Sequence, residues 1–183
     1  MEKQMIRFPL ATALGAIGLA LSVPAAAALP VGATAPDFTT QASLAGVPFE
    51  FHLADALKKG PVVLYFFPAA FTTGCTFEAH EFAEATEEFA KLGATVVGVS
   101  ADNIEALNKF SVSECRNKFA VASASGKVIS AYQVKLPVVE KSNRTSFAIA
   151  PDGKIISEYS DLSYKEHVSR MMAAVKEWRA AHP

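Results

Sequence analysis

Two short runs rich in valine and aromatic residues, with a segment of helical periodicity between them, constrain the fold of this chain more than any other feature. The runs cover residues 62–67 and 94–100, and Pro68 follows the first of them. Such runs, without polar alternation, are typical of strands that are covered on both faces of a sheet. The sequence therefore predicts strand, helix and strand in succession, which is the repeating unit of an α/β fold.

The segment between the two runs, residues 75–92, has the pattern of an amphipathic helix. Its apolar residues recur near helical spacing with acidic residues between them, and Gly93 follows as a stop signal. The apolar positions are Phe77, Phe82, Ala85, Phe89 and Leu92. We expect these side chains to form the face that packs against the sheet.

A further helix is predicted directly after the second run. Asp102, with Glu105 three residues later, resembles a capping box, and this pattern predicts a helix that begins there and runs through Phe110. The alternation of strands and helices therefore continues beyond the first unit.

The C-terminal part of the chain predicts a hairpin and a last helix. Residues 145–150 and 154–159 flank Pro151, Asp152 and Gly153, a turn that favours an antiparallel hairpin. Residues 166–181 have the pattern of a helix. The whole succession is expected of a thioredoxin-like fold, with a central mixed sheet flanked by helices, although it also suits other small α/β domains.

The N-terminus has the pattern of a signal peptide. Lys3 and Arg7 precede an apolar stretch at residues 8–23, and Pro24 and a run of alanines offer a cleavage site after Ala28. The stretch is short for a membrane span, although an uncleaved membrane anchor is the alternative. We therefore divide the chain into a signal peptide, residues 1–28, and one domain, residues 29–183, which we expect to be exported to the periplasm without stable membrane association once processed.

The charge of the predicted mature domain disfavours two classes of partner. Removal of residues 1–28 leaves 15 of the 17 basic and 17 of the 18 acidic side chains, a net formal charge of −2. No basic run interleaved with aromatic residues remains, so we expect neither nucleic acid nor anionic lipid as a partner. A small-molecule substrate stays open.

Only two cysteines occur in the sequence, Cys75 and Cys115. They form no C-x-x-C pair and no cluster with zinc-ligand spacing. Cys75 follows Gly74 where the predicted helix begins, and free N–H groups and the helix dipole favour the nucleophilic thiolate at such a position. Cys75 is therefore a candidate nucleophile, while a small buried apolar residue is the other interpretation that position alone allows.

The residues around Cys75 resemble the peroxiredoxin family. Pro68, Thr72 and Cys75 stand at the spacing P-x-x-x-T-x-x-C. Other segments similar to the family are residues 35–38 (APDF), 62–68 and 144–147 (RTSF). The resemblance runs from about Val31 to the C-terminal helix and is closest to the peroxiredoxin Q, or bacterioferritin comigratory protein, branch. It implies a thiol-dependent peroxidase that reduces hydrogen peroxide and organic hydroperoxides and needs neither a metal nor an organic cofactor.

The resemblance also implies a role for each matching residue. Cys75 would attack the peroxide and become a sulfenic acid, while Thr72, Arg144 and the Cys75 N–H would bind the peroxide and stabilise the departing oxygen. Pro68 would cover the thiolate from water. A helix cap for Thr72 and a solvated surface charge for Arg144 are the alternatives.

The second half of the reaction is less well defined by the family pattern. His80 stands five residues after Cys75, where many members of the branch carry a resolving cysteine. Cys115 lies in a region where other members carry it, so we expect a Cys75–Cys115 disulfide to form after the helix unwinds locally. A permanent structural disulfide and an external resolving thiol are the alternatives. The expected reductant is a thioredoxin-like protein or a small thiol, and the expected state is a monomer or a homodimer.

Some positions depart from the family pattern, and other functions therefore remain to be weighed. Phe71, Ala120 and Ala150 replace residue types common in relatives, and the apolar Phe71 favours organic hydroperoxides as substrates. The four histidines show no metal spacing and are interpreted as surface or packing residues; they are His52, His80, His167 and His182. The rival functions are a thioredoxin-like thiol-disulfide oxidoreductase and a non-catalytic redox or binding module.

Overall fold

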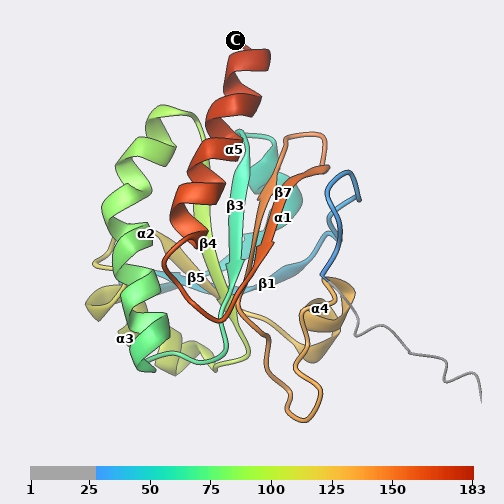
Figure 1. Ribbon diagram of the computed structural model, residues 1–183. Helices are drawn as coiled ribbons and strands as arrows, with labels where there is room; N and C mark the ends of the chain where they lie inside the picture. Colours follow the sequence, from blue (N-terminus) through green and yellow to red (C-terminus); the bar gives the residue numbers. More distant parts are fainter. Residues whose placement is uncertain (1–27) are drawn as a thin grey trace, which may run out of the picture.

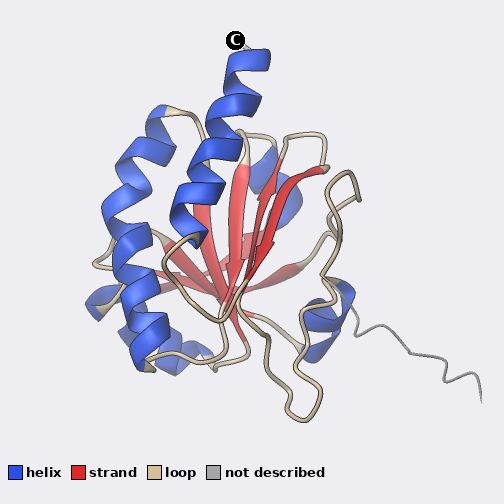
Figure 2. Cartoon of the chain, viewed as in Figure 1, coloured by secondary structure: helices blue, strands red, loops and turns tan. Residues whose placement is uncertain are grey.

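The run at residues 62–67 forms β3 (Val62–Phe66), which lies inside a seven-stranded mixed sheet in the computed structural model of the protein. The structure describes residues 28–183, so residues 1–27, almost the whole predicted signal peptide, lie outside the described part. All five residues of β3 are buried, as expected for a strand covered on both faces. The sheet is flanked by helices, as the sequence predicts (Figure 2).

The order of strands across the sheet is β2-β1-β5-β4-β3-β6-β7. β3 pairs in parallel with β4 and antiparallel with β6, and β4 pairs in parallel with β5. The remaining pairs are antiparallel, including the predicted hairpin β6–β7. The other strands are β1 (Thr39–Leu44), β2 (Val47–His52), β4 (Thr95–Ser100), β5 (Ala120–Ser123), β6 (Thr145–Ile149) and β7 (Ile155–Ser160).

Helices cover both faces of the sheet, and each face has its own apolar core. α2, α3 and α5 pack on one face, where α2 and α5 lie side by side, and α1 and α4 pack on the other (Figure 1). The helices are α1 (Leu53–Leu57), α2 (Thr73–Lys91), α3 (Ile104–Ser113), α4 (Gly126–Ala131) and α5 (His167–Ala181). Both cysteines belong to the core under α2, α3 and α5.

The structure corrects the predicted start of α3. Asn103, not Asp102, is the N-cap residue, and its side chain accepts a hydrogen bond of 2.9 Å from the Ala106 N–H. The Asp102 carboxylate instead accepts hydrogen bonds from the Ala70 N–H, at 2.7 Å, and from the Ser100 hydroxyl, at 2.9 Å. It therefore anchors the loop between β3 and α2.

The structure also corrects the buried face of α2. Phe77, predicted to be part of the apolar face, is 48% exposed and stacks on Tyr164 at a ring-centroid distance of 5.6 Å. The face toward the sheet instead contains Cys75, Glu78 and Ala79. Phe82 and Phe89 are fully buried as predicted, and Ala85 and Leu92 pack against the same core, so only the first turn differs. There Glu78 places a carboxyl group inside the core, one helical turn after the cysteine.

No helix within residues 28–183 is both long enough and apolar enough to cross a membrane.

Candidate active site

Cys75 lies in the first turn of α2, at the edge of the sheet where β3 ends. Its side chain is 1% exposed and belongs to the core between the sheet and the helices. The N–H groups in the first turn of a helix lack partners within the helix and carry its positive dipole end. A negative charge on the buried sulfur is therefore stabilised by the backbone around it.

Arg144 reaches Cys75 from the neighbouring strand. It directly precedes β6, and the antiparallel register Phe66↔Thr145 places it beside the end of β3. Nη2 of Arg144 lies 3.5 Å from Sγ of Cys75, and Nε donates to the Leu162 carbonyl oxygen at 3.0 Å. With only 6% of its surface exposed, Arg144 is a buried cation, not the solvated surface charge that was the alternative.

Gly74 allows this close approach between the guanidinium and the helix. A Cβ atom at position 74 would lie 3.1 Å from Nη2 of Arg144, tighter than ordinary van der Waals contact. A larger residue at position 74 would therefore push the guanidinium away from the sulfur.

Glu78 is a site residue that the sequence interpretation missed. Its carboxylate accepts a hydrogen bond from Nη1 of Arg144 through Oε2, and the side chain is fully buried. Burial raises the pKa of Glu78 to about 8, although the charge and hydrogen bond of Arg144 oppose this rise. Its spacing three residues after Cys75 is the signal that could have placed it on the same helix face.

The neighbouring Glu78 and Cys75 also shift the pKa of Arg144. Burial lowers the pKa of Arg144, but the negative charges of Glu78 and Cys75 outweigh it, and the pKa is raised above its usual value. The guanidinium therefore stays positively charged while it contacts two groups that can each carry a negative charge.

Thr72 occupies the N-cap position of α2, but its side chain makes no capping hydrogen bond. Its hydroxyl donates to the Ala69 carbonyl oxygen at 3.0 Å, and the residue is exposed. Pro68, half-buried, follows β3 on the other side of this loop. Both residues stand in the loop that leads into the Cys75 helix, as the predicted motif requires.

Cys115 is the second thiol in the same core. It follows the end of α3 and is fully buried, and its N–H donates to the Phe110 carbonyl oxygen at 3.0 Å. Burial, with a smaller contribution from Glu114, raises the pKa of the Cys115 thiol well above its usual value. Cys75 and Cys115 are not joined by a disulfide in this structure, and both are buried.

Aromatic side chains surround the loop that carries the motif. Phe71 is 50% exposed and packs edge-on against Phe110, with ring centroids 5.3 Å apart. Its φ of 64° lies in the left-handed region, which is uncommon for a bulky residue. Phe77 and Tyr164 stack nearby, so part of the surface around the buried sulfur is aromatic.

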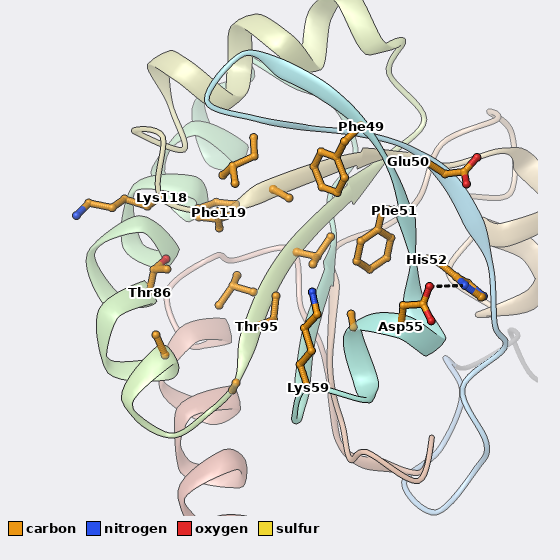
Figure 3. A pocket seen from close by; sticks show the side chains of 17 residues that line it. Phe49, Glu50, Phe51, His52, Asp55, Lys59, Thr86, Thr95, Lys118 and Phe119 are labelled. Carbon is orange, nitrogen blue, oxygen red and sulfur yellow. Dashed lines mark hydrogen bonds and ion pairs between the residues drawn. The ribbon is translucent and has the colours of Figure 1, made fainter.

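A cavity lies away from Cys75, on the other side of the molecule from the site residues described above. It has a volume of about 600 Å³. Its lining includes Phe49 and Phe51 of β2, Lys59 after α1, and Thr86 in the C-terminal half of α2 (Figure 3). None of the residues around the Cys75 sulfur lines it. This cavity is therefore separate from the surroundings of Cys75.

His80 and the other predicted packing histidines differ in their surroundings. Nε2 of His80 lies 3.0 Å from Oε2 of Glu114, and His52 lies between Asp37 and Asp55 at the surface. His167, in contrast, is fully buried beside Glu78. Within residues 28–183 no group of three His, Cys, Asp or Glu side chains is arranged to hold a metal ion.

Comparisons with known proteins agree with the sequence motif. A model described as the AhpC/TSA family matches residues 31–158. Peroxiredoxin Bcp of Bacillus subtilis is 32% identical over 126 residues, covering 63% of this chain and 78% of that protein. Peroxiredoxin Bcp of Escherichia coli K12 is 30% identical over 122 residues, with the same two coverages.

Solved structures show the same fold. The crystal structure of peroxidoxin BcpB from Mycobacterium tuberculosis has a TM-score of 0.71 and 33% identity, and the match covers 80% of this chain and 96% of that one. A Xylella fastidiosa PrxQ mutant, at 23% identity, has a TM-score of 0.72 and supports the fold alone, with coverages of 83% and 98%. These similarities confirm the predicted thioredoxin-like fold.

Proposed function

Because the chain belongs to the AhpC/TSA family and is therefore a peroxiredoxin, a thiol-dependent peroxidase, we propose that Cys75 is the thiol that attacks the hydroperoxide. The observation that carries this assignment is the contact of 3.5 Å between Nη2 of Arg144 and Sγ of Cys75 in a buried site. A guanidinium at this distance stabilises the thiolate, which is the nucleophilic form of cysteine.

The proposed first step transfers one oxygen atom from the peroxide to the sulfur. The Cys75 thiolate attacks the terminal oxygen of ROOH, so that an S–O bond forms as the O–O bond breaks. The departing RO⁻ takes a proton and leaves as an alcohol, or as water from hydrogen peroxide. Cys75 is oxidised by two electrons to a sulfenic acid, and the peroxide is reduced by the same two electrons.

Arg144, Thr72 and the Cys75 N–H supply hydrogen-bond donors for this step. Negative charge moves from the sulfur to the departing oxygen, so donors already fixed at the site stabilise the transition state. We assign the Thr72 hydroxyl to the peroxide, because Thr72 is exposed three residues before Cys75 and its hydroxyl is not used for helix capping. To donate to the peroxide, the hydroxyl must turn away from the Ala69 carbonyl oxygen, to which it donates at 3.0 Å. Pro68 limits the access of water to the sulfur.

Cys115 is the proposed resolving thiol. Its sulfur attacks the sulfur of the Cys75 sulfenic acid, which forms a disulfide and releases water. Both side chains are buried in the same core. Before the sulfurs can react, the first turn of α2 must therefore unwind, and the side chains packed around Cys115 must move away from its sulfur. A permanent disulfide would remove the reactive thiol, and an external thiol remains the competing resolver.

Reduction of the disulfide returns both cysteines to thiols. Membership of the family implies a hydroperoxide substrate and a thioredoxin-type reductant. We extend this to a thioredoxin-like protein or a small thiol in the compartment of the exported domain. The export itself rests on the N-terminal sequence pattern, and a monomer or a homodimer is the proposed assembly.

Peroxide consumption by the purified domain, residues 29–183, tests the function. In the presence of dithiothreitol, the domain is expected to consume hydrogen peroxide, and Cys75→Ser is expected to abolish this activity. Peroxide consumption that survives Cys75→Ser would refute the assignment of Cys75. An insulin-reduction assay on the same samples tests the rival thiol-disulfide oxidoreductase, for which the chain lacks a C-x-x-C pair.

A further inference from the structure

The cavity lined by Phe49 and Lys59 lies where the sheet opens at the start of β4. β5 begins only at Ala120, which pairs with Val97, so the first two residues of β4 have no partner on the β5 side. Residues of the β1–β2 hairpin, α1 and α2 line the other walls (Figure 3). Cys75 follows the carboxyl end of β3, whereas the cavity lies at the amino end of the parallel β4, so the two lie at opposite ends of the sheet.

The walls of the cavity are largely apolar. Aromatic and aliphatic side chains line it from several elements, including Phe49, Phe51, Val97 and Phe119. Phe49 is 40% exposed, and Leu44, which also lines the cavity, is 41% exposed. Neighbouring apolar side chains that stay exposed often mark a binding surface. The cavity volume of about 600 Å³ lies within the range of roughly 300–1,000 Å³ that is usual for small-molecule sites.

Lys59 brings a positive charge into these apolar surroundings. Figure 3 shows its side chain directed into the cavity, between Thr95 and Phe51. Among residues 28–183 its Nζ makes no ion pair, whereas the neighbouring Lys58 pairs with Asp55 at 2.7 Å. An ammonium group beside apolar walls is suited to the acidic head of an amphipathic molecule.

The other charged side chains that line the cavity are paired or point away from it. Asp55 also contacts His52, with an oxygen–nitrogen distance of 3.2 Å, and Lys118 pairs with Glu87 at 2.8 Å. Figure 3 shows the Glu50 carboxylate directed out of the cavity. Within the described part of the chain, the ammonium inside the cavity is therefore available to an anionic ligand.

We propose that this cavity binds a long-chain carboxylate, with the alkyl chain on the apolar walls and the carboxylate on the Lys59 ammonium. Transfer of the alkyl chain from water to the aromatic and aliphatic walls supplies the affinity. The ammonium supplies the preference for an anionic head, because a cationic head would be repelled by it. The proposed site is separate from Cys75, so it does not depend on the proposed peroxidase reaction.

Calorimetric titration of the domain, residues 29–183, with fatty-acid anions tests the proposal. The ligands are octanoate, decanoate and dodecanoate, each below the concentration at which it forms micelles. We expect saturable binding of one ligand, with an affinity that rises about fourfold for each additional CH₂ group that the cavity buries. Dodecyltrimethylammonium carries the same chain as dodecanoate with a cationic head, and it should bind about fivefold or more weakly.

Two substitutions separate the charge from the apolar walls. Lys59→Met should weaken dodecanoate binding about threefold to fivefold at low salt and remove the preference over dodecyltrimethylammonium. Lys109→Met, on an exposed lysine of α3 outside the cavity, is the matched control and should bind like the wild type. Thr95→Phe places an aromatic side chain at an exposed strand position that lines the cavity, and it should abolish saturable binding of both ligands.

Amide chemical shifts measured during the dodecanoate titration locate the ligand. Changes are expected at residues 95–97 and 118–120, which line the cavity, and not around Cys75. Peroxide consumption by each variant shows that it is folded, since none of the substituted residues belongs to the proposed active site.

The proposal is overturned if dodecanoate shows no saturable binding, if dodecyltrimethylammonium binds equally well, or if Lys59→Met and Lys109→Met bind dodecanoate with the same affinity. Shift changes confined to the surroundings of Cys75 would also overturn it. Should Thr95→Phe not fold, the comparison of the two lysine variants still decides, because both residues are exposed. Loss of peroxide consumption in the wild-type domain would instead refute the proposed function and leave the binding result unaffected.

Discussion

Nη2 of Arg144 lies 3.5 Å from the sulfur of Cys75, although the two residues are 69 positions apart in the sequence. The pairing of β3 with β6 brings them together, because Arg144 precedes β6 at the edge of the sheet where β3 leads into the Cys75 helix. The sheet register, and not the local motif, thus supplies the cation of the proposed site.

Replacement of Arg144 should strongly reduce the reaction with peroxide. Arg144→Met removes a donor and a positive charge that act on the transition state, and such a loss costs on the order of 10²–10³ in rate. The measurement is the second-order rate constant for hydrogen peroxide, with Arg179→Met on exposed α5 as the control. A rate for Arg144→Met within a factor of about two of the control would remove Arg144 from the catalytic group.

Removal of the Thr72 hydroxyl should slow peroxide reduction without unfolding the helix. Thr72→Val keeps the shape of the side chain and loses its hydrogen-bond donor, whereas Thr72→Ser keeps the hydroxyl. We expect about a tenfold or larger loss for valine and a rate close to that of wild type for serine. Thr73→Val, one residue further on, is the control; equal effects at positions 72 and 73 would indicate a general change at the helix start.

Cys115 should be required for the disulfide but not for the first oxidation. After one equivalent of hydrogen peroxide, the wild-type domain should lose two hydrogen atoms and yield a Cys75–Cys115 linked peptide. Cys115→Ala should instead carry one added oxygen on Cys75. A sulfenic or sulfinic acid on Cys75 of the wild-type domain, with Cys115 still free, would rule out Cys115 as the resolving thiol.

Phe71 should influence the choice of peroxide. Its half-exposed ring adds apolar surface to the loop that carries the motif, which favours a bulky organic group over hydrogen peroxide. Phe71→Asn should therefore lower the ratio of the rate constants for cumene hydroperoxide and hydrogen peroxide, and asparagine tolerates the left-handed backbone at this position. The control is Phe49→Ala at the distant cavity, and an unchanged ratio in Phe71→Asn would argue against this role.

Glu78 should make the protein less stable as the pH rises toward 8. Its pKa is higher in the folded state, about 8, than its ordinary value of 4.5, so the folded state binds more protons between these values and loses stability as the pH rises through them. Glu78→Gln should remove this slope. Urea unfolding at pH 5 and pH 8 measures it, and an equal loss of stability with pH in both proteins would contradict the raised pKa.

The sequence predicted the strands and helices whose patterns are long and regular. β3, α2, β4 and the β6–β7 hairpin lie where their apolar patterns indicate. β1, β2, β5, α1 and α4 were not predicted. β1 and β2 are largely exposed and lack a regular alternation of buried residues, and β5, α1 and α4 have only four to six residues and no continuous β-branched and aromatic run.

Within the site, the sequence motif located Cys75 but not the groups behind it. Glu78 was missed because Phe77, one residue earlier, was predicted to be on the buried face of the helix, and because acidic residues are seldom buried. The position of His167 beside Glu78 depends on how α5 packs on α2, which no local pattern in either helix reveals.

Trapping of the first oxidised product tests the central assignment most directly. The Cys115→Ala domain is mixed with one equivalent of hydrogen peroxide in the presence of dimedone, and the labelled peptides are identified by mass spectrometry. The account predicts a dimedone adduct on Cys75 in proportion to the peroxide consumed. Consumption of the peroxide with an unlabelled and unoxidised Cys75 peptide would contradict it.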